Sequence, residues 1–354
     1  MRLLTLTQLN VRNLRTARLD FPPGIVAVVG QNAAGKSNLL EAVYLACTGE
    51  LAGARTTEMV RLGEEEGYVA GEIEHDEGVS KVEVGLAPGR KQIRLDGQAA
   101  RAGDVARHVT AVLLTPEDAD LVHGPPSGRR AFLDGLLVRL SPRYGALMRE
   151  YHRVVEQRNA LLRLAPYDPS LDVWTDRFLK LGSEIEDLRE RAVGRLAPLA
   201  SEVYADIAGP ASPVLGVTLE RSHACASLEE ALASAAQEER ARGVTPVGPH
   251  RDDLGLTLAG HSIQAYGSRG EARTAALALR VAEYRLLSEK HREPPVLLID
   301  DFTAELDERR RGYLLRLAAS TPQVLVSGTE PPPRFDELYR VAAGAFTREA
   351  VVHE

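Results

Sequence analysis

The chain has 354 residues, of which 44% are hydrophobic and 26% charged, as in ordinary globular domains. A formal net charge of −7 excludes a uniformly basic nucleic-acid binder but leaves room for a local basic patch. No apolar run is long enough to span a membrane, and the first residues lack a signal-peptide layout. Two cysteines, Cys47 and Cys225, exclude a disulfide framework. We expect a cytoplasmic protein without a membrane partner.

The first third of the chain predicts strands around one helix. Apolar residues alternate between residues 3 and 21, as in a half-buried strand pair. The apolar run 25–29 predicts a strand, and a helical pattern follows at 39–45. Glycine-bearing turns separate the next predicted strands, which are 68–74, 81–84, 91–95 and 111–114.

A phosphate-binding loop is predicted between that strand and that helix. The loop fits the pattern G-x-x-x-x-G-K-[ST] at every fixed position and consists of Gly30, Gln31, Asn32, Ala33, Ala34, Gly35, Lys36 and Ser37. Successive backbone N–H groups and a helix N-terminus favour a phosphate there. Lys36 would reach the β- and γ-phosphates, and the Ser37 hydroxyl would ligate Mg²⁺. The strand–loop–helix context makes a turn that binds nothing the weaker alternative, and we expect bound ATP.

The middle of the chain predicts long helices. Ser141-Pro142 resembles an N-cap followed by Pro at the first helical position. Leucines and aromatic residues mark one face of helices at 132–140 and 144–155. Trp174, Phe178, Leu181, Ile185, Leu188 and Ala192 form an a/d seam of nearly three heptads. An antiparallel helical pair is therefore expected, either as a projecting arm or as an ordinary hairpin on its own domain. A capping box at Ser227–Glu230 predicts a further helix to about residue 240.

The last third returns to an α/β pattern. Strands are predicted at 254–258, 262–265, 296–299 and 324–326, with helices at 271–290 and 307–319. Because the phosphate loop and the acidic strand described next belong to one nucleotide site, the two chain ends must fold together. We predict an α/β head domain from residues 1–122 and 241–354, and a mainly helical insertion from residues 123–240.

The apolar strand 296–299 ends in two carboxylates, Asp300 and Asp301. In phosphate-loop NTPases the first acid on such a strand holds Mg²⁺, often through water. Asp301 would then lie near the γ-phosphate and orient or deprotonate a water molecule. We therefore predict Lys36, Asp300 and Asp301 as catalytic residues, with Ser37 and Asp300 at the magnesium ion. The alternative is an Asp pair that only caps the next helix.

A second phosphate-seeking helix end is predicted at Ser268, Arg269, Gly270 and Glu271. Ser268-x-x-Glu271 is a capping box, and a helix N-terminus with spare N–H groups and a hydroxyl is an anion site. For this segment alone, a capping box that only caps the helix is the simpler interpretation. Its position about thirty residues before the acidic strand favours a functional role.

Taken together, these motifs resemble the ATP-binding-cassette ATPases, in particular the structural-maintenance-of-chromosomes (SMC) branch and, within it, the RecF family of bacterial recombination mediators. The resemblance covers nearly the whole chain. The blocks that carry it are Leu9-x-Val11-x-Asn13-Leu14, Gly30–Ala42, Arg55-Thr56, Thr115–Asp118, Gly128–Arg130, Gly248–Asp253, Ser268–Glu271, Leu297–Asp301 and Ala304–Asp307.

The resemblance implies an ATP-dependent homodimer. Ser268 and Gly270 of one copy would contact the γ-phosphate bound at the loop of a second copy, and Glu305 and Asp307 would lie at the same interface. Hydrolysis would release the two copies. The family is further implied to bind DNA when loaded with ATP, and to act with RecO and RecR in loading RecA at single-strand gaps.

Two departures from the pattern bear on hydrolysis. Asp301 stands where the ATP-binding-cassette pattern often has Glu, and its shorter reach weakens the expected placement of water. Ser327-Gly328-Thr329 stands where a switch His is usual, and Thr329 is the candidate for that role. The Gln of the usual Q-loop is not obvious near 115–118. These differences favour slow, switch-like hydrolysis by a weak ATPase.

The predicted DNA surface rests on arginines. Between residues 127 and 163 there are eight Arg and three acidic residues, an excess that could contact several phosphates. Few aromatic residues are interleaved, so base stacking is not indicated. We predict Arg129, Arg130 and Arg139 as DNA contacts, with single-stranded, duplex and junction DNA all open. A solvated helix face with Arg stems covering apolar surface is the alternative.

Three other functional classes are compatible with a phosphate loop. A phosphoryl-transferring enzyme would need an acceptor pocket and lid, and it has no use for Ser268–Glu271. The ATPase subunit of a membrane transporter would need a groove for a membrane partner, which no segment suggests. A non-hydrolysing SMC-like clamp would differ from the main interpretation only in turnover.

Overall fold

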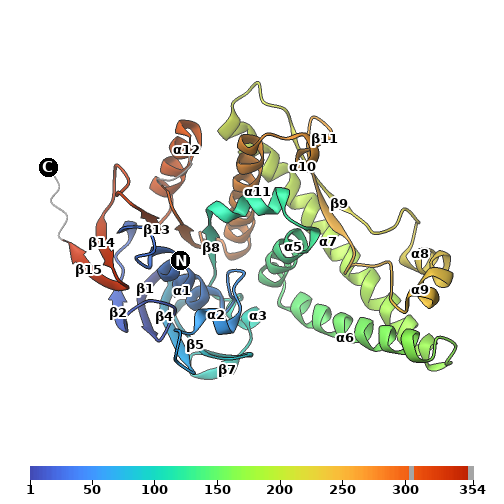
Figure 1. The fold of residues 1–354 in the computed structure, drawn as a ribbon. Helices are drawn as coiled ribbons and strands as arrows, with labels where there is room; N and C mark the ends of the chain where they lie inside the picture. The colour runs from blue at the N-terminus through green and yellow to red at the C-terminus, as the bar shows by residue number, and fades with distance from the viewer. Residues whose placement is uncertain (303–306, 350–354) are drawn as a thin grey trace. The chain divides into compact units, whose positions relative to one another are not determined.

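Segments from both ends of the chain fold into one compact unit. The computed structural model describes residues 1–302 and 307–349. The first unit comprises Met1–Asp118, Val203–Ser212 and the chain from Leu277 on, and the second comprises Ala119–Glu202 and Pro213–Ala276. The blue and red ends of the chain therefore belong to the same unit (Figure 1).

A mainly parallel sheet forms the centre of the first unit. Its order is β15-β14-β3-β13-β12-β8, and only the edge strand β15 runs antiparallel to its neighbour. Its inner strands are continuous apolar runs because both faces of such a sheet are covered. The strands are β3 (Gly24–Val29), β8 (Ala111–Leu114), β12 (Val296–Ile299), β13 (Gln323–Gly328), β14 (Glu337–Ala342) and β15 (Ala345–Glu349).

An antiparallel sheet forms a second layer of this unit, in the order β2-β1-β4-β5-β6-β7. Helix α1 (Lys36–Thr48) buries Leu39, Leu40 and Val43 in one core that includes residues of both sheets, such as Leu6 and Val26. The strands are β1 (Arg2–Leu9), β2 (Ala17–Asp20), β4 (Gly67–His75), β5 (Gly78–Ala87), β6 (Arg90–Leu95) and β7 (Gln98–Ala100). The remaining helices that begin in this unit are α2 (Thr56–Met59), α3 (Ala102–Val105), η1 (Pro116–Ala119) and α12 (Glu308–Ala319).

The second unit is mainly helical and carries a small antiparallel sheet in the order β11-β10-β9. Two of its helices, α7 and α11, continue into segments of the first unit. The helices are α4 (Asp120–His123), α5 (Pro126–Leu140), α6 (Pro142–Leu164), α7 (Ser170–Ala208), α8 (Leu228–Ser234), α9 (Ala236–Arg242), α10 (Ile263–Tyr266) and α11 (Arg269–His291). The strands are β9 (Leu215–Glu220), β10 (Asp253–Leu258) and β11 (His261–Ser262).

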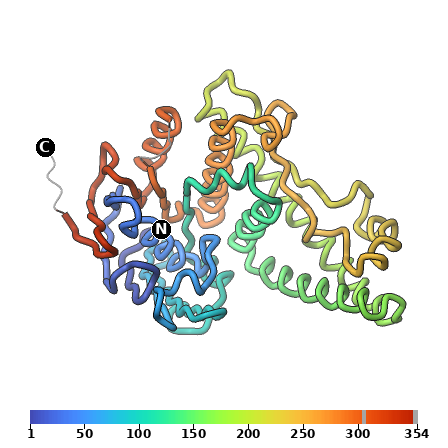
Figure 2. Tube along the Cα trace, viewed as in Figure 1, coloured from blue at the N-terminus to red at the C-terminus, as the bar shows by residue number. Residues whose placement is uncertain are grey.

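Helices α6 and α7 form the expected antiparallel pair (Figure 2). Three contacts show that the helices run in opposite directions, because the residue number on α7 falls as the residue number on α6 rises. They join Arg143 with Glu184, Glu150 with Arg177, and Arg158 with Thr175. Phe178 and Ile185 of the predicted seam are fully buried. The α/β fold with a helical pair is therefore confirmed.

Several predicted elements differ in the structure. The strand predicted at 262–265 is wrong: β11 ends at Ser262, and Ile263–Tyr266 is a helical turn that buries only Ile263. The helix predicted from 228 to about 240 is divided at Ala235 into α8 and α9. Strands β9, β14 and β15 were not predicted. Because β10 pairs with β9, residues 241–276 fold with the second unit, whereas the sequence assigned them to the head.

Within the described residues, no helix combines the length and the apolar composition that a bilayer crossing requires.

Gln323, at the start of β13, ties the two sheets of the first unit together. Its fully buried amide donates to the carbonyl oxygens of Leu3 and Pro22, both at 2.9 Å, and accepts from the Leu3 N–H at 2.8 Å. Gln323→Leu removes these bonds and leaves buried backbone groups unpaired. We expect a loss of about 2–4 kcal/mol in the free energy of unfolding.

The loss should appear as a lower urea midpoint for the first unit. Gln157→Leu, at an exposed position of α6, is the matched control and should leave the midpoint nearly unchanged. Equal midpoints for the two variants would show that the buried amide does not stabilise the fold.

Candidate nucleotide-binding site

The loop Gly30–Ser37 connects the end of β3 to the start of α1, as predicted. Two of its positions require glycine. A Cβ on Gly30 would lie 2.4 Å from the Val341 carbonyl oxygen of the neighbouring strand β14. Gly35 has a φ of 116°, which side chains rarely adopt, and its Cβ would lie 2.9 Å from Asn13 Oδ1. The loop thus forms a turn that leads directly into a helix N-terminus.

Lys36 is folded over this loop. Its side chain is only 7% exposed, and Nζ donates to the carbonyl oxygens of Gly30 at 2.8 Å and Gln31 at 2.9 Å. A cation is therefore positioned among the loop's backbone groups, while Gln31, Asn32, Ala33 and Ser37 are exposed. This arrangement offers positive charge and N–H donors to an anion approaching from solvent.

Asn13 supports the loop from the chain's N-terminal segment. Its Nδ2 donates to the Ala33 carbonyl oxygen at 3.1 Å, and its Oδ1 accepts from Asn38 Nδ2 at 2.7 Å. The contact fixes the loop, whose Ala33 has a positive φ of 62°. The sequence indicated Asn13 only through its place in a family block, because no local pattern shows that residue 13 meets residue 33.

Asp300 lies at the same edge of the sheet as the loop. Strands β3 and β12 both run parallel to β13, which lies between them, so their carboxyl ends share one edge. Asp300 is held there by two contacts: its amide donates to the Leu114 carbonyl oxygen at 2.8 Å, and its Oδ1 accepts from Ser327 Oγ. Carboxylate and hydroxyl oxygens are the ligands Mg²⁺ prefers, so Asp300 and the exposed Ser37 fit that ion.

Ser327 is a site residue that the sequence did not single out. Besides contacting Asp300, its Oγ accepts from the Asp301 amide at 2.9 Å, so one hydroxyl orients both acids. Asp301 has a φ of 51°, in the left-handed region that few residues other than glycine adopt. The strand end is thus turned sharply at the two carboxylates. Thr329 lies just beyond the end of β13.

Glu41 of α1 adds a third carboxylate near this edge. Burial raises its pKa, the neighbouring Arg12 opposes that rise, and Asp300 and Glu117 raise it further. The Arg12 guanidinium lies 2.6 Å from Glu41. Asp300 and Glu117 lie close enough to act on Glu41, so several carboxylates gather at this edge. Their combined negative charge would attract a cation.

Ser268–Glu271 forms the predicted capping box at the start of α11. Ser268 N–H and Oγ–H each donate to Glu271 Oε2 at 2.8 Å, and Glu271 N–H donates to Ser268 Oγ at 3.2 Å. These bonds from Ser268 lower the pKa of Glu271, so the carboxylate stays charged. Ser268, Arg269 and Gly270 are all exposed. The segment belongs to the second unit and the loop to the first.

The predicted interface loop is described in part. Asp307 is the N-cap of α12, and its Oδ1 accepts from the Arg310 N–H at 2.9 Å. Glu305 lies outside the described residues.

The structure corrects the predicted DNA contacts. Arg129 is 4% exposed and forms a two-bond ion pair with Asp253, at 2.8 and 2.7 Å. Arg139 is equally buried. In this conformation neither side chain offers its charge to a phosphate, and exposing either one would break buried contacts at a cost. Arg130 is half-buried and donates to the Asp252 carbonyl oxygen at 2.8 Å.

The block Gly248–Asp253 lies in a buried polar network of the second unit. His250 Nδ1 lies 2.7 Å from the Tyr151 hydroxyl, and Nε2 lies 3.1 Å from the Thr245 carbonyl oxygen. Arg189, which is 1% exposed, contacts both Asp134 at 2.8 Å and Asp252 at 3.6 Å. The block therefore joins α5, α6 and α7.

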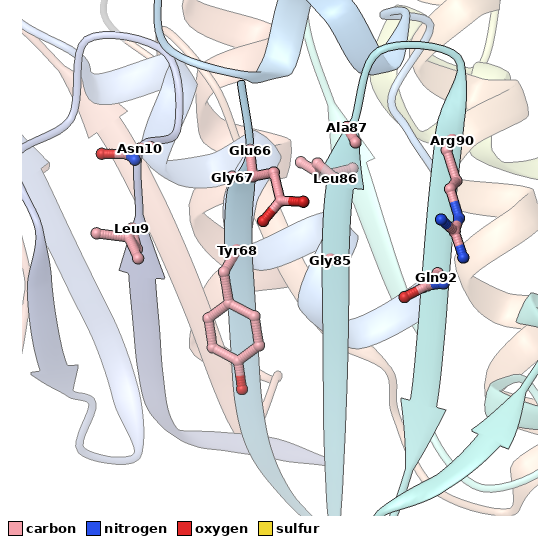
Figure 3. Close-up of a pocket in the computed structure, with 10 residues that line it drawn as sticks. All are labelled: Leu9, Asn10, Glu66, Gly67, Tyr68, Gly85, Leu86, Ala87, Arg90 and Gln92. Atoms are coloured by element: carbon pink, nitrogen blue, oxygen red, sulfur yellow. The ribbon is translucent and has the colours of Figure 1, made fainter. Parts of the chain in front are cut away.

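A shallow hollow of about 320 Å³ lies on the antiparallel sheet (Figure 3). Apolar, aromatic and charged side chains of four neighbouring strand segments line it. None belongs to Gly30–Ser37, Asp300 or Ser268–Glu271, so the hollow is separate from the candidate nucleotide residues. The lining residues are Leu9, Asn10, Glu66, Gly67, Tyr68, Gly85, Leu86, Ala87, Arg90 and Gln92.

The two sheets, the loop helix between them and the acidic strand define an ATPase head of the ATP-binding-cassette type. The model of the RecF/RecN/SMC N-terminal domain family matches residues 2–342. The chain is 50% identical to the DNA replication and repair protein RecF of Deinococcus radiodurans, over 98% of this chain and 95% of that protein. It is 49% identical to RecF of Deinococcus deserti, over 99% and 96%. The chain belongs to the RecF family.

Solved structures agree with this assignment. One described as the recombination mediator protein RecF-ATP in the RecFOR pathway superposes with a TM-score of 0.91 at 28% identity, covering 98% of this chain and 97% of that one. An SMC head bound to the C-terminal winged-helix domain of ScpA has a TM-score of 0.55 at 16% identity, covering 99% and 98%. The latter likeness concerns the fold alone.

His250 makes the stability of the second unit depend on pH. Burial lowers the pKa of His250 from 6.5 to about 4, so the folded state holds the neutral ring. The contribution of the neutral ring to the free energy of unfolding is complete above pH 6.5. It is lost as the pH falls from 6.5 through about 4, because the unfolded chain binds the proton at a higher pH than the folded chain does. The loss amounts to about 3 kcal/mol at most.

Urea midpoints measured between pH 7 and pH 4 test this dependence. The wild type should lose stability over that range, and His250→Gln should lose less, since it has no ring to protonate. His261→Gln, at an exposed position, should follow the wild type. A wild-type curve parallel to that of His250→Gln would contradict the assignment.

Proposed function

We propose that the protein is an ATP-switched DNA-binding protein of recombinational repair and replication-fork maintenance, with slow ATP hydrolysis as its release step. One observation carries the proposal. The chain has two helix N-termini suited to phosphate, one in the loop Gly30–Ser37 and one at the exposed capping box Ser268–Glu271, and they lie in different units. A single nucleotide bound between two copies would use both.

In this proposal ATP and Mg²⁺ bind at the loop. Backbone N–H groups of Gly30–Ser37 receive the phosphates, and Lys36 exchanges its bonds to the Gly30 and Gln31 carbonyls for bonds to the β- and γ-phosphates. Ser37 and Asp300 hold Mg²⁺, which neutralises phosphate charge. Ser327 orients Asp300 by its hydroxyl contact.

The second copy completes the site in the proposed homodimer. Ser268 Oγ and the N–H groups of Arg269 and Gly270 would face the γ-phosphate bound to the partner. Glu271 keeps the Ser268 hydroxyl in place through the two bonds of the capping box. Asp307, at the exposed start of α12, is proposed for the same interface, together with Glu305.

Hydrolysis is proposed to be slow. Asp301 is the candidate for orienting the attacking water, and it has one methylene less than the Glu usual at this place. Its backbone is fixed by the Ser327 bond at 2.9 Å, so the carboxylate cannot extend by moving the main chain without losing that contact. ATP binding would therefore hold the dimer long enough to act on DNA.

The proposed DNA surface moves from Arg129 and Arg139 to helix α6. Arg149 and Arg153 are exposed and four residues apart, so they lie on one face. Neither takes part in an ion pair within the part of the chain that the structure describes. Two such cations can each neutralise a DNA phosphate, and Arg163 extends the exposed basic residues along the same helix.

The family membership supports a place in a larger pathway. We propose that the ATP-bound dimer acts in the cytoplasm with RecO- and RecR-type proteins to load RecA at gaps coated by single-strand-binding protein.

Two variants test the shared site. Lys36→Met should weaken ATP binding by about tenfold or more, because it removes a charge-assisted bond, and should abolish ATP-dependent dimerisation. Ser268→Arg should leave ATP binding to the monomer unchanged and still block the dimer. The measurements are ATP affinity by calorimetry and solution mass with ATP, with ADP and without nucleotide.

Ser170→Arg, at the exposed start of α7, is the matched control and should dimerise normally. If Lys36→Met still dimerises with ATP, nucleotide does not join the copies. If Ser268→Arg loses ATP affinity as Lys36→Met does, Ser268 acts within its own chain.

The DNA surface is tested by the double variant Arg149→Glu/Arg153→Glu. Its affinity for DNA in the presence of ATP should fall, and the slope of log affinity against log salt should flatten by about 2. Arg101→Glu/Arg107→Glu, an equal charge change at exposed positions of the first unit, is the control. An unchanged slope in the α6 variant would place the DNA elsewhere.

A further inference from the structure

Three potential metal ligands meet at the end of strand β4, away from the nucleotide residues. His75 and Asp76 end that strand and begin the turn to β5, and Glu293 lies in the connection between α11 and β12. One ligand atom from each side chain lies within 4.8 Å of the others. All three residues belong to the first unit.

The His75 side chain has one nitrogen in a hydrogen bond and one without a partner. His75 is only 9% exposed, and its Nε2 lies 3.0 Å from the Ser80 hydroxyl. The other nitrogen, Nδ1, is buried and has no hydrogen-bond partner among the described residues. An imidazole whose one nitrogen is oriented by a hydrogen bond while the other remains available is the usual state of a metal-binding His. Without a metal ion, a buried nitrogen that lacks a hydrogen bond lowers the stability of the fold.

The two carboxylates are held differently. Glu293 accepts from the Asp76 N–H at 3.0 Å and lies 2.9 Å from the Met1 amine. A carboxylate has about four acceptor positions, so these two donors leave capacity for a cation. The Asp76 side chain is exposed and gives the cluster an opening to solvent.

We propose that His75, Asp76 and Glu293 form a binding site for a divalent transition-metal ion, with Zn²⁺ as the best match. One imidazole and two carboxylates suit Zn²⁺, which binds nitrogen and oxygen together. Mg²⁺ prefers an all-oxygen shell and keeps its waters, so the proposed site differs in chemistry from Ser37 and Asp300.

Further imidazoles lie nearby. The His108 ring centroid is 6.0 Å from that of His75, and His108 Nδ1 lies 3.2 Å from Glu77. Nε2 of His291, two residues before Glu293, is buried without a hydrogen-bond partner in the described part of the chain. A three-ligand zinc site keeps a fourth position for water or another imidazole.

The metal would join two segments that are far apart in sequence. His75 is the last residue of β4 in the antiparallel sheet and Asp76 follows it, whereas Glu293 precedes β12, whose other end carries Asp300. A bound ion therefore fixes the start of the acidic strand against the second sheet. Since the unfolded chain does not hold these ligands together, binding stabilises the folded first unit.

The test uses the full chain, stripped of metal with a chelator and kept free of nucleotide. Titration with ZnCl₂ by calorimetry should show one Zn²⁺ per chain at micromolar affinity, and saturation should raise the melting temperature by about 2–4 °C. Co²⁺ as a spectroscopic substitute should give visible absorption bands, whereas Mg²⁺ should not displace either ion.

His75→Gln and Asp76→Asn should lose this binding and the temperature shift, while His261→Gln, at an exposed position, should keep both. Asp76→Asn changes an exposed side chain, so its metal-free melting temperature should equal that of the wild type and loss of binding cannot be ascribed to unfolding. A wild-type chain that binds no Zn²⁺, or an Asp76→Asn chain that binds it unchanged, overturns the proposal.

Discussion

The pairing of β3 with β13 and β14 is the constraint on which the nucleotide edge depends. β3 comes from the start of the chain and both neighbours come from its end. This pairing places the Val341 carbonyl oxygen against Gly30, which leaves room for no side chain there. It also sets the end of β3 beside Ser327, whose hydroxyl orients the carboxylate of Asp300. Loop, acid and orienting hydroxyl are therefore products of one sheet register.

Local patterns predicted the parts of this edge well. The buried runs 25–29 and 296–299 and the loop between strand and helix each carry a short-range signal, and each is present in the structure. The same holds for the capping box at Ser268 in the second unit. Strand β14 was missed, Asn13 was indicated only by a family block, and at Ser327-Gly328-Thr329 the sequence favoured Thr329, because these parts matter through contacts with residues distant in sequence. No window of sequence reveals that Asn13 reaches the Ala33 carbonyl oxygen.

The arginines of the second unit show a second limit of sequence reasoning. Arg129 and Arg149 look equivalent as charges in a helical stretch, yet one is paired with Asp253 in the interior and the other is exposed. Which of them is buried depends on where β10 places its first residue, Asp253, and β10 is more than a hundred residues away. Buried arginines are retained only with partners such as Asp253 for Arg129 and Glu239 for Arg158, so charge counts overstate the surface available to DNA.

The position of β3 in the sheet also has a consequence during synthesis. The strand emerges from the ribosome early, but β13 and β14 follow about 300 residues later, which at about 5–20 residues per second is a delay of about 15–60 s. During that time an apolar strand with two unpaired edges has no native neighbours, a state prone to association with other chains. The nascent chain should therefore depend on chaperones until its last strands appear, and a truncated product that lacks them could not form the nucleotide loop.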